Sequence, residues 1–392
     1  MQSRRGDLPL FLLSASAGLA SYLFSLLVDR AFGSLVLAHL LRLISATSAI
    51  TLPSALLLLP VAAWAGHAPA LKRRLPALQV GALLLGAASL AAFAIVDRHV
   101  PSAWLWGLGL LAMFSSYPLY LGAGVLCGRG AFIPYGVVTA LPTVGRLIIL
   151  AVVLALGGGV APAVWGLGLS AVAATALATV LPYAVTAPPA ATPAAPGATW
   201  ASAFVALAVT AWLSSDIVFG SVGLAPAAAS LFAIIALLGK TPFWLAQPLA
   251  TKAIAQQSLG TGGGTAMAWE IFAIGLAAVA GGLVLGRFVL HVMQVPVSGL
   301  AALLVYFAGS TLLARAYVSA GSAAQHGRHQ WWPLLAGFGA FAFLALMWRT
   351  DVLGLSLRYG LCIAAATAAQ MLLERRGARM AGTRAPLAAA AP

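Results

Sequence analysis

Long hydrophobic runs occupy almost the whole chain, and short segments with polar residues, glycine or proline separate them. A run of about 20 apolar residues is long enough to cross the hydrocarbon core of a bilayer as a helix. The pattern predicts twelve such helices, at residues 8–28, 35–64, 77–96, 103–126, 131–156, 162–184, 200–220, 227–251, 267–288, 297–318, 331–348 and 352–373. These helices leave no room for a soluble domain, so the sequence predicts an all-α polytopic membrane protein.

The predicted helices fall into two blocks of six. Residues 1–184 carry the first block and 200–373 the second, with a proline- and alanine-rich linker at 185–199 and a basic tail at 374–392. The first helix of each block ends in the same D-x-x-F-G-S pattern, starting at Asp29 and at Asp216. Because six is even, both blocks start on the same side of the membrane. We therefore expect two six-helix lobes related by a pseudo-two-fold axis along the membrane normal.

The composition agrees with a membrane protein. Of 392 residues, 62% are hydrophobic and 7% are charged, whereas about 25% are charged in soluble domains. The net charge of +14 does not indicate a nucleic-acid partner, because the bases lie at the ends of the apolar runs. That placement predicts that both termini are cytoplasmic, with twelve bases at inner ends and four at outer ends (Arg30, Arg98, Arg287 and Arg349).

The sequence contains no complete motif for a cofactor, a metal ion or a catalytic site. Cys127 and Cys362 lie far apart without a CxxC or a histidine pattern, so we expect neither a disulfide nor a metal site. The Gly-Lys-Thr at 239–241 resembles the end of a phosphate-binding loop, but Ile234 stands where that loop needs glycine. The sequence predicts no cofactor and no catalytic residues.

Charged residues inside the predicted helices are the candidates for ligand binding. Arg146 shares one helical face with Tyr135, Thr139 and Thr143, and such a polar face is expected to point into the bundle. Lys240 shares a second face with three polar or amphipathic residues (Trp244, Gln247 and Thr251). Both bases lie too deep to reach an interface easily, so we interpret them as anion-binding residues. Arg42 and Arg358 lie nearer the outer end. They are either outer partners of this anion site or bases whose side chains extend to the membrane interface. For Arg315, near the inner end, we expect the side chain to extend to the interface.

Asp216 is the deepest predicted acid. It is a candidate proton or cation site that couples an ion gradient to function, and a structural ion pair explains it equally well.

Residues 211–256 resemble the seventh and eighth helices of the polysaccharide flippases in the MOP exporter superfamily. The shared features are an acid late in one helix, a short turn with small residues, the pattern Ala227-x-x-x-Leu231-Phe232-Ala233, then Leu-Gly-Lys and a later proline. The family often has tyrosine at Phe232, and its helix usually ends at a proline where this chain has Lys252. Over the rest of the chain, the resemblance is one of topology.

The resemblance implies a bacterial inner-membrane flippase, not an enzyme. Its substrate would be a polyprenyl-diphosphate-linked oligosaccharide that moves from the inner to the outer leaflet by alternating access, for surface polysaccharide export. Membrane lipid, a polysaccharide polymerase and glycosyltransferases are the implied partners. One alternative is an exporter of small amphipathic molecules, although cationic cargo would call for interior acids. A membrane-embedded glycosyl or phosphosugar transferase is the other alternative, and the loops offer no DxD for its metal.

Overall fold

The structure, a computed structural model, describes residues 7–55, 57–64, 102–185, 198–258, 264–292, 296–326, 328–348 and 350–388, and most of 76–91. The first half contains α1 (Asp7–Phe32), α2 (Ser34–Ala55), α3 (Leu58–Trp64), α5 (Ser102–Gly128), α6 (Phe132–Ala155) and α7 (Val160–Ala184). The second half contains α8 (Ala198–Gly223), α9 (Pro226–Gly239), α10 (Thr241–Ser258), α11 (Gly264–Val292), η2 (Val297–Gly299), α12 (Leu300–Gln325), α13 (Trp332–Met347) and α14 (Val352–Ala388). Most of the predicted linker, the inner bases Arg4, Arg5 and Lys72–Arg74, and the outer bases Arg98 and Arg349 lie outside the described residues.

In the part of the chain that the structure describes, each of the twelve predicted spans contains helix, and two of the spans are interrupted. The second span, 35–64, is divided into α2 and α3, and the eighth, 227–251, into α9 and α10. In each case a proline, Pro60 or Pro242, lies in the first turn after the interruption. A proline fits that position because the first turn of a helix has no internal partner for its N–H groups. The described residues between 76 and 91, within the third span, are helical.

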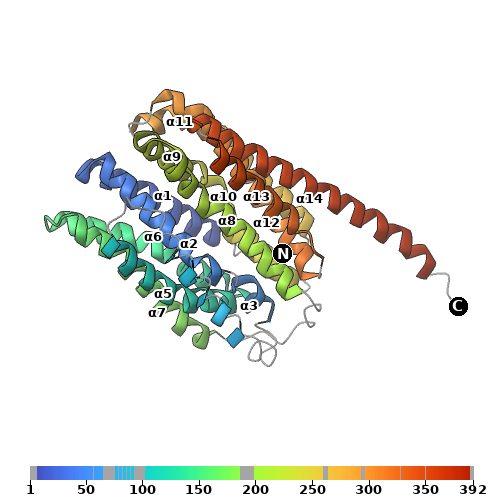
Figure 1. Cartoon of the computed structure of the whole chain (residues 1–392). Coiled ribbons are helices and arrows are strands. Elements are labelled where there is room, and N and C mark those ends of the chain that lie inside the picture. Colours follow the sequence, from blue (N-terminus) through green and yellow to red (C-terminus); the bar gives the residue numbers. More distant parts are fainter. Residues whose placement is uncertain are drawn as a thin grey trace.

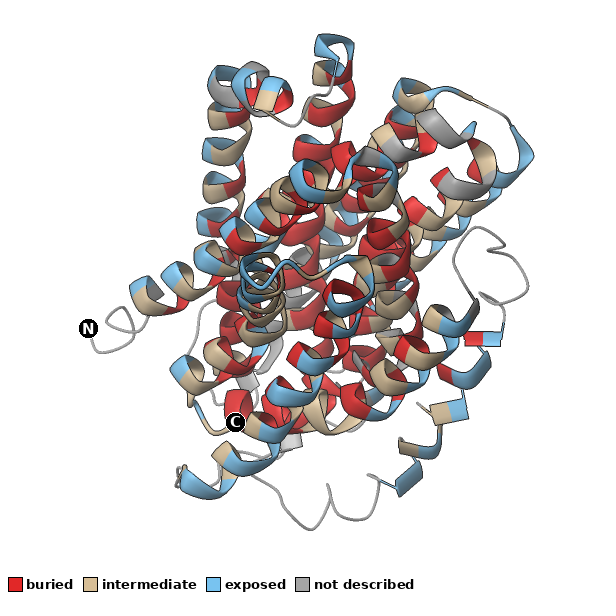
Figure 2. Cartoon of the chain, turned by 90° about the vertical axis from the view of Figure 1, so that its left-hand side faces the viewer, coloured by how far each residue is buried: buried red, intermediate tan, exposed pale blue. Residues whose placement is uncertain are grey.

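These helices make the protein a multi-pass integral membrane protein. Eight of the described helices are long and apolar enough to cross a bilayer. Four shorter apolar helices, Leu35–Ser48, Gln79–Ala88, Ala268–Val284 and Trp332–Met347, match the remaining predicted spans. Exposed residues lie on the outer faces of the bundle and buried residues in its interior (Figure 2). Large exposed side chains such as Val284, Phe288 and Leu361 fit a surface in contact with lipid.

Each half has the same packing pattern. In the first half α1 packs on α6, α5 on α7, and α6 on α7. The equivalent pairs in the second half, α8 with α13, α12 with α14, and α13 with α14, also pack together. The contacts between halves follow the same symmetry, because α2 packs on α8 and α10 packs on α1. The halves lie side by side, with α1–α7 on one side and α8–α14 on the other, and α14 extends beyond the bundle (Figure 1). The all-α fold with two six-helix halves is thus confirmed.

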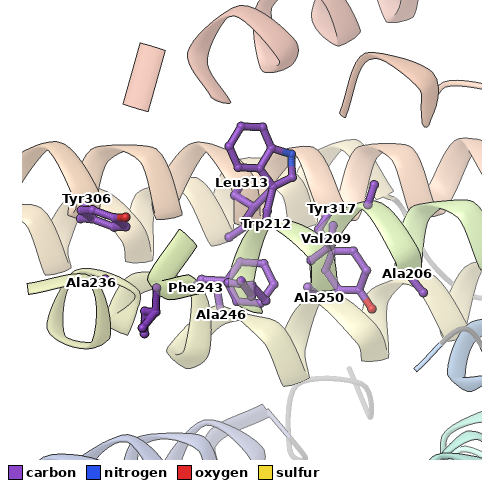
Figure 3. Close-up of a cluster of buried hydrophobic side chains, with 14 of the residues drawn as sticks. Ala206, Val209, Trp212, Ala236, Phe243, Ala246, Ala250, Tyr306, Leu313 and Tyr317 are labelled. Atoms are coloured by element: carbon purple, nitrogen blue, oxygen red, sulfur yellow. The ribbon is translucent and has the colours of Figure 1, made fainter. Parts of the chain in front are cut away.

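Aromatic side chains form the core of the second half. Trp212 on α8 is fully buried, and its ring centroid lies 5.6 Å from that of Phe341 and 5.4 Å from that of Tyr359. Figure 3 shows Trp212 among the buried side chains of the second half, which include Tyr306 and Tyr317 on α12. The Trp212 indole N–H donates to the Leu334 carbonyl at 3.0 Å, so its polar atom is satisfied. This packing joins α8 to α13 and α14.

Candidate functional site

A central cavity lies between the two halves. Its three adjoining spaces, of about 250, 310 and 130 Å³, share Ser48 on α2 and the α10 residues Trp244 and Gln247. Helices α1, α2, α5 and α6 of the first half and α8 and α10 of the second contribute to the walls. A space bounded by both halves is where a transporter built from repeats binds its cargo.

The cavity wall is rich in hydroxyl groups and contains no carboxylate among the described lining residues. Arg146 is the one charged side chain that these residues include. Aromatic rings are contributed by Tyr120, Tyr135 and Trp244. The hydroxyls come from all parts of the wall (Ser14, Ser21, Thr47, Ser48, Thr51, Ser115, Ser116, Thr139, Thr143, Ser170, Thr210 and Ser214). This chemistry suits a ligand that is anionic and can form many hydrogen bonds.

Arg146 has the predicted orientation. It lies on α6 with Thr139 and Thr143, and all three side chains line the cavity. The Arg146 guanidinium donates from Nη2 to Ser21 Oγ at 2.8 Å and lies 5.2 Å from the centre of the Phe24 ring. Its Nε is buried and has no hydrogen-bond partner among the described residues. A guanidinium with five N–H donors therefore retains donors for a ligand.

Lys240 lies elsewhere, inside the second half. Its Nζ is 2.6 Å from Asp216 Oδ1 and donates to the Leu213 carbonyl at 2.7 Å. The other carboxylate oxygen of Asp216 accepts the Tyr306 hydroxyl at 3.0 Å. Asp216 is fully buried and Lys240 is 3% exposed. Each charge is thus paired and hydrogen-bonded within the protein, which corresponds to the ion-pair alternative for Asp216.

Lys240 stands between α9 and α10, but the helical hydrogen bonds continue past it. The Lys240 N–H donates to the Ala236 carbonyl at 3.2 Å, and the Trp244 N–H donates to the Lys240 carbonyl at 3.1 Å. The Lys240 side chain reaches Asp216 on α8 and is not part of the described cavity lining. Trp244 and Gln247 face the cavity, whereas the Thr251 hydroxyl lies 3.2 Å from that of Tyr317 in the core. Gly239 allows α12 to approach closely, because a Cβ there would lie 2.2 Å from Tyr306 Cβ. Of the four residues on the predicted face of the eighth span, Trp244 and Gln247 line the cavity, and Lys240 and Thr251 are not among the described lining residues.

The other predicted bases lie away from the described cavity lining. Arg42 is 7% exposed on α2. Arg358 donates to the carbonyls of Leu344 and Trp348, at 2.9 and 2.7 Å, and so caps the carboxyl end of α13. Arg315 is buried, and its Nη2 lies 3.5 Å from Glu374 Oε2. The expected extension of this side chain to solvent is therefore not seen.

The contribution of α1 to the cavity was not predicted from the sequence. Ser14, Gly18 and Ser21 line it together, and their spacing of four and three residues places them on one helical face. This small and polar stripe in an apolar helix was the signal that could have identified them.

Comparison with known proteins adds evidence on the fold alone. No family model matches the sequence, and no curated protein matches it. Among solved structures, an outward-facing multidrug resistance MATE family transporter of the MOP superfamily is similar, with a TM-score of 0.64 and 15% identity over 94% of this chain and 93% of the other. The lipid II flippase MurJ in an inward closed conformation gives 0.59 and 11% identity over 93% and 87%.

A third similar structure is a MOP superfamily transporter from Pyrococcus furiosus, described by the reverse polarity of its binding pocket. Its TM-score is 0.59, with 15% identity over 94% of both chains. All three structural similarities extend over nearly the whole chain. In each, the helical arrangement is similar although the sequence identity is low. The protein therefore has the fold of the MOP-superfamily transporters, with a central cavity between its two halves.

Proposed function

We propose that the protein is a transporter that flips a polyprenyl-diphosphate-linked oligosaccharide across a bacterial cytoplasmic membrane by alternating access. The observation that carries the proposal is the cavity itself, where Arg146 is the one charged side chain in a described wall rich in hydroxyls and free of carboxylates. A diphosphate complements a guanidinium, and sugars complement hydroxyls and aromatic rings.

The diphosphate is assigned to Arg146. Its Nη2 is held by Ser21, and its Nη1 makes no hydrogen bond to a described residue. The free donor and the fixed orientation favour binding of a phosphate oxygen, because little side-chain entropy remains to be lost. Lys240, Arg42 and Arg358 were expected to share this role. We now restrict it to Arg146, because Lys240 is neutralised by Asp216 and Arg358 caps α13.

The sugars are assigned to Trp244 and Gln247 on α10 and to the hydroxyls of α2 and α5, which line the same space as Arg146. Trp244 is 38% exposed, so its ring is available for stacking. The prenyl chain stays in the bilayer, since only the polar head must avoid the roughly 30 Å of hydrocarbon. Each half contributes to the binding of one head group, so the ligand can stabilise one arrangement of the halves over another.

The runner-up is an exporter of small amphipathic molecules, and the similar multidrug MATE structure favours it. Cationic cargo suits the cavity poorly, because Arg146 repels it and no described lining residue offers a carboxylate. The similarity to the lipid II flippase favours a lipid-linked cargo.

The proposal is tested in proteoliposomes that contain a fluorescent polyprenyl-diphosphate sugar. A reagent that quenches only the outer leaflet reports flipping. The wild-type protein should flip the lipid, and Arg146→Ala should lose at least about tenfold in rate, while Arg146→Lys keeps part of it. Arg375→Ala is the matched control, because Arg375 is exposed on α14. Flipping at the protein-free rate by the wild-type protein, with export of an amphipathic dye, would favour the runner-up.

A further inference from the structure

A proline in the middle of α10 leaves one carbonyl without its usual donor. In an α-helix the carbonyl of Trp244 accepts the N–H of residue 248, but that residue is Pro248, which has none. The Ser14 hydroxyl on α1 donates to this carbonyl at 2.5 Å. The donor comes from the other half of the protein, 230 positions away in the chain.

A second contact of the same kind lies further along α1. The Tyr22 hydroxyl donates to the Leu238 carbonyl at 3.2 Å, and the helical donor of that carbonyl is missing because residue 242 is Pro242. The Thr241 hydroxyl also reaches this carbonyl, at 2.6 Å. Ser14 and Tyr22 are eight residues apart, so they lie on one face of α1. The prolines at 242 and 248 thus leave two backbone acceptors toward that face.

We infer that Ser14 positions α1 against α10 by binding the carbonyl that Pro248 leaves free, and that this bond is a releasable joint between the two halves. The packing of α1 on α10 is one of the contacts between halves, so any motion that separates the halves along this line must break it. Tyr22 is a second, weaker point of the same joint, because the Leu238 carbonyl also has Thr241.

The chemistry makes the joint easy to open and close. Ser14 and Trp244 both line the cavity, so water there can bind both groups once they separate. A joint of this kind has the net strength of one protein hydrogen bond and favours the closed contact without locking it. The inference concerns the protein without cargo and does not depend on the identity of the substrate.

The test measures the distance between the halves in purified, substrate-free protein. Spin labels are placed at Leu8 on α1 and Trp269 on α11, which are 64% and 59% exposed, after both cysteines are replaced. Pulsed electron-electron resonance then gives the populations of the near and far arrangements. Ser14→Ala should increase the far population about two- to tenfold, the range that corresponds to one hydrogen bond. Ser14→Thr should behave as the wild type.

Two controls separate the joint from a general loss of packing. Ser16→Ala removes an exposed hydroxyl that bonds within α1, to the Leu13 carbonyl, and should leave the populations unchanged. Pro248→Ala restores the N–H at position 248, so Ser14→Ala in that background should have little further effect. An equal shift from Ser14→Ala in both backgrounds, or no shift in either, would overturn the inference.

Discussion

Lys240 and Asp216 form a buried ion pair inside the second half, with 2.6 Å between Nζ and Oδ1. The pair joins α8 to the interruption between α9 and α10, and Tyr306 on α12 completes it. Three helices that carry or support the cavity wall are thereby fixed to one another. The pair therefore supports the shape of the cavity and leaves its charge to Arg146.

Removal of one partner should destabilise the protein. Lys240→Ala leaves the Asp216 carboxylate buried without its cation, and a loss of about 3–5 kcal/mol in stability is expected. The double variant Asp216→Asn/Lys240→Met should recover most of that loss, because no charge remains buried. Thermal unfolding in detergent measures both. A Lys240→Ala protein of normal stability that has lost transport would instead show that Lys240 binds the substrate.

Asp216 stays a candidate for ion coupling, because it is a fully buried carboxylate in a membrane-spanning helix. If it couples transport to a gradient, Asp216→Asn should make flipping in proteoliposomes insensitive to an imposed proton or sodium gradient. Asn retains a similar shape and can accept the Tyr306 hydroxyl, but it leaves the Lys240 ammonium buried without its anion. Flipping is therefore compared per folded molecule. Full transport with unchanged gradient sensitivity would assign Asp216 a structural role.

Arg358 provides a test of a base without a transport role. Arg358→Ala removes the two bonds to the Leu344 and Trp348 carbonyls at the end of α13. A loss of about 1–3 kcal/mol in stability is expected, as for hydrogen bonds from a charged donor. Thermal unfolding should show this decrease, and the flipping rate per folded molecule should be normal. A specific loss of flipping would return Arg358 to the substrate site.

The orientation of the protein remains a prediction from its bases. With both termini cytoplasmic, the connections around Ala70 and Ala194 face inward. Single cysteines at these positions, in a cysteine-free background, should resist a membrane-impermeant maleimide added to intact cells and react after permeabilisation. Strong labelling of intact cells at either position contradicts the orientation.

Local sequence patterns predicted the helices and the α6 part of the site. Runs of apolar residues locate helices because each span must satisfy its own backbone in lipid. The face containing Thr139, Thr143 and Arg146 was predicted because α6 is continuous over these residues. Lys240 lies one helical turn before Trp244, as the periodicity predicts, but its side chain reaches Asp216 and does not line the described cavity. The pairing of Lys240 with Asp216 depends on tertiary packing, which the sequence does not show.

Arg146 is the residue proposed to bind the diphosphate of the cargo. The most direct test is the affinity of purified protein for a polyprenyl diphosphate, compared with the uncharged polyprenol of the same chain length, by native mass spectrometry or calorimetry. We expect the wild-type protein and Arg375→Ala to prefer the diphosphate equally, and Arg146→Ala to bind it at least about tenfold more weakly, as expected for a lost charge-assisted contact. Binding of the polyprenol should be the same in all three. Equal affinity of Arg146→Ala and the wild-type protein for the diphosphate would show that Arg146 does not bind it.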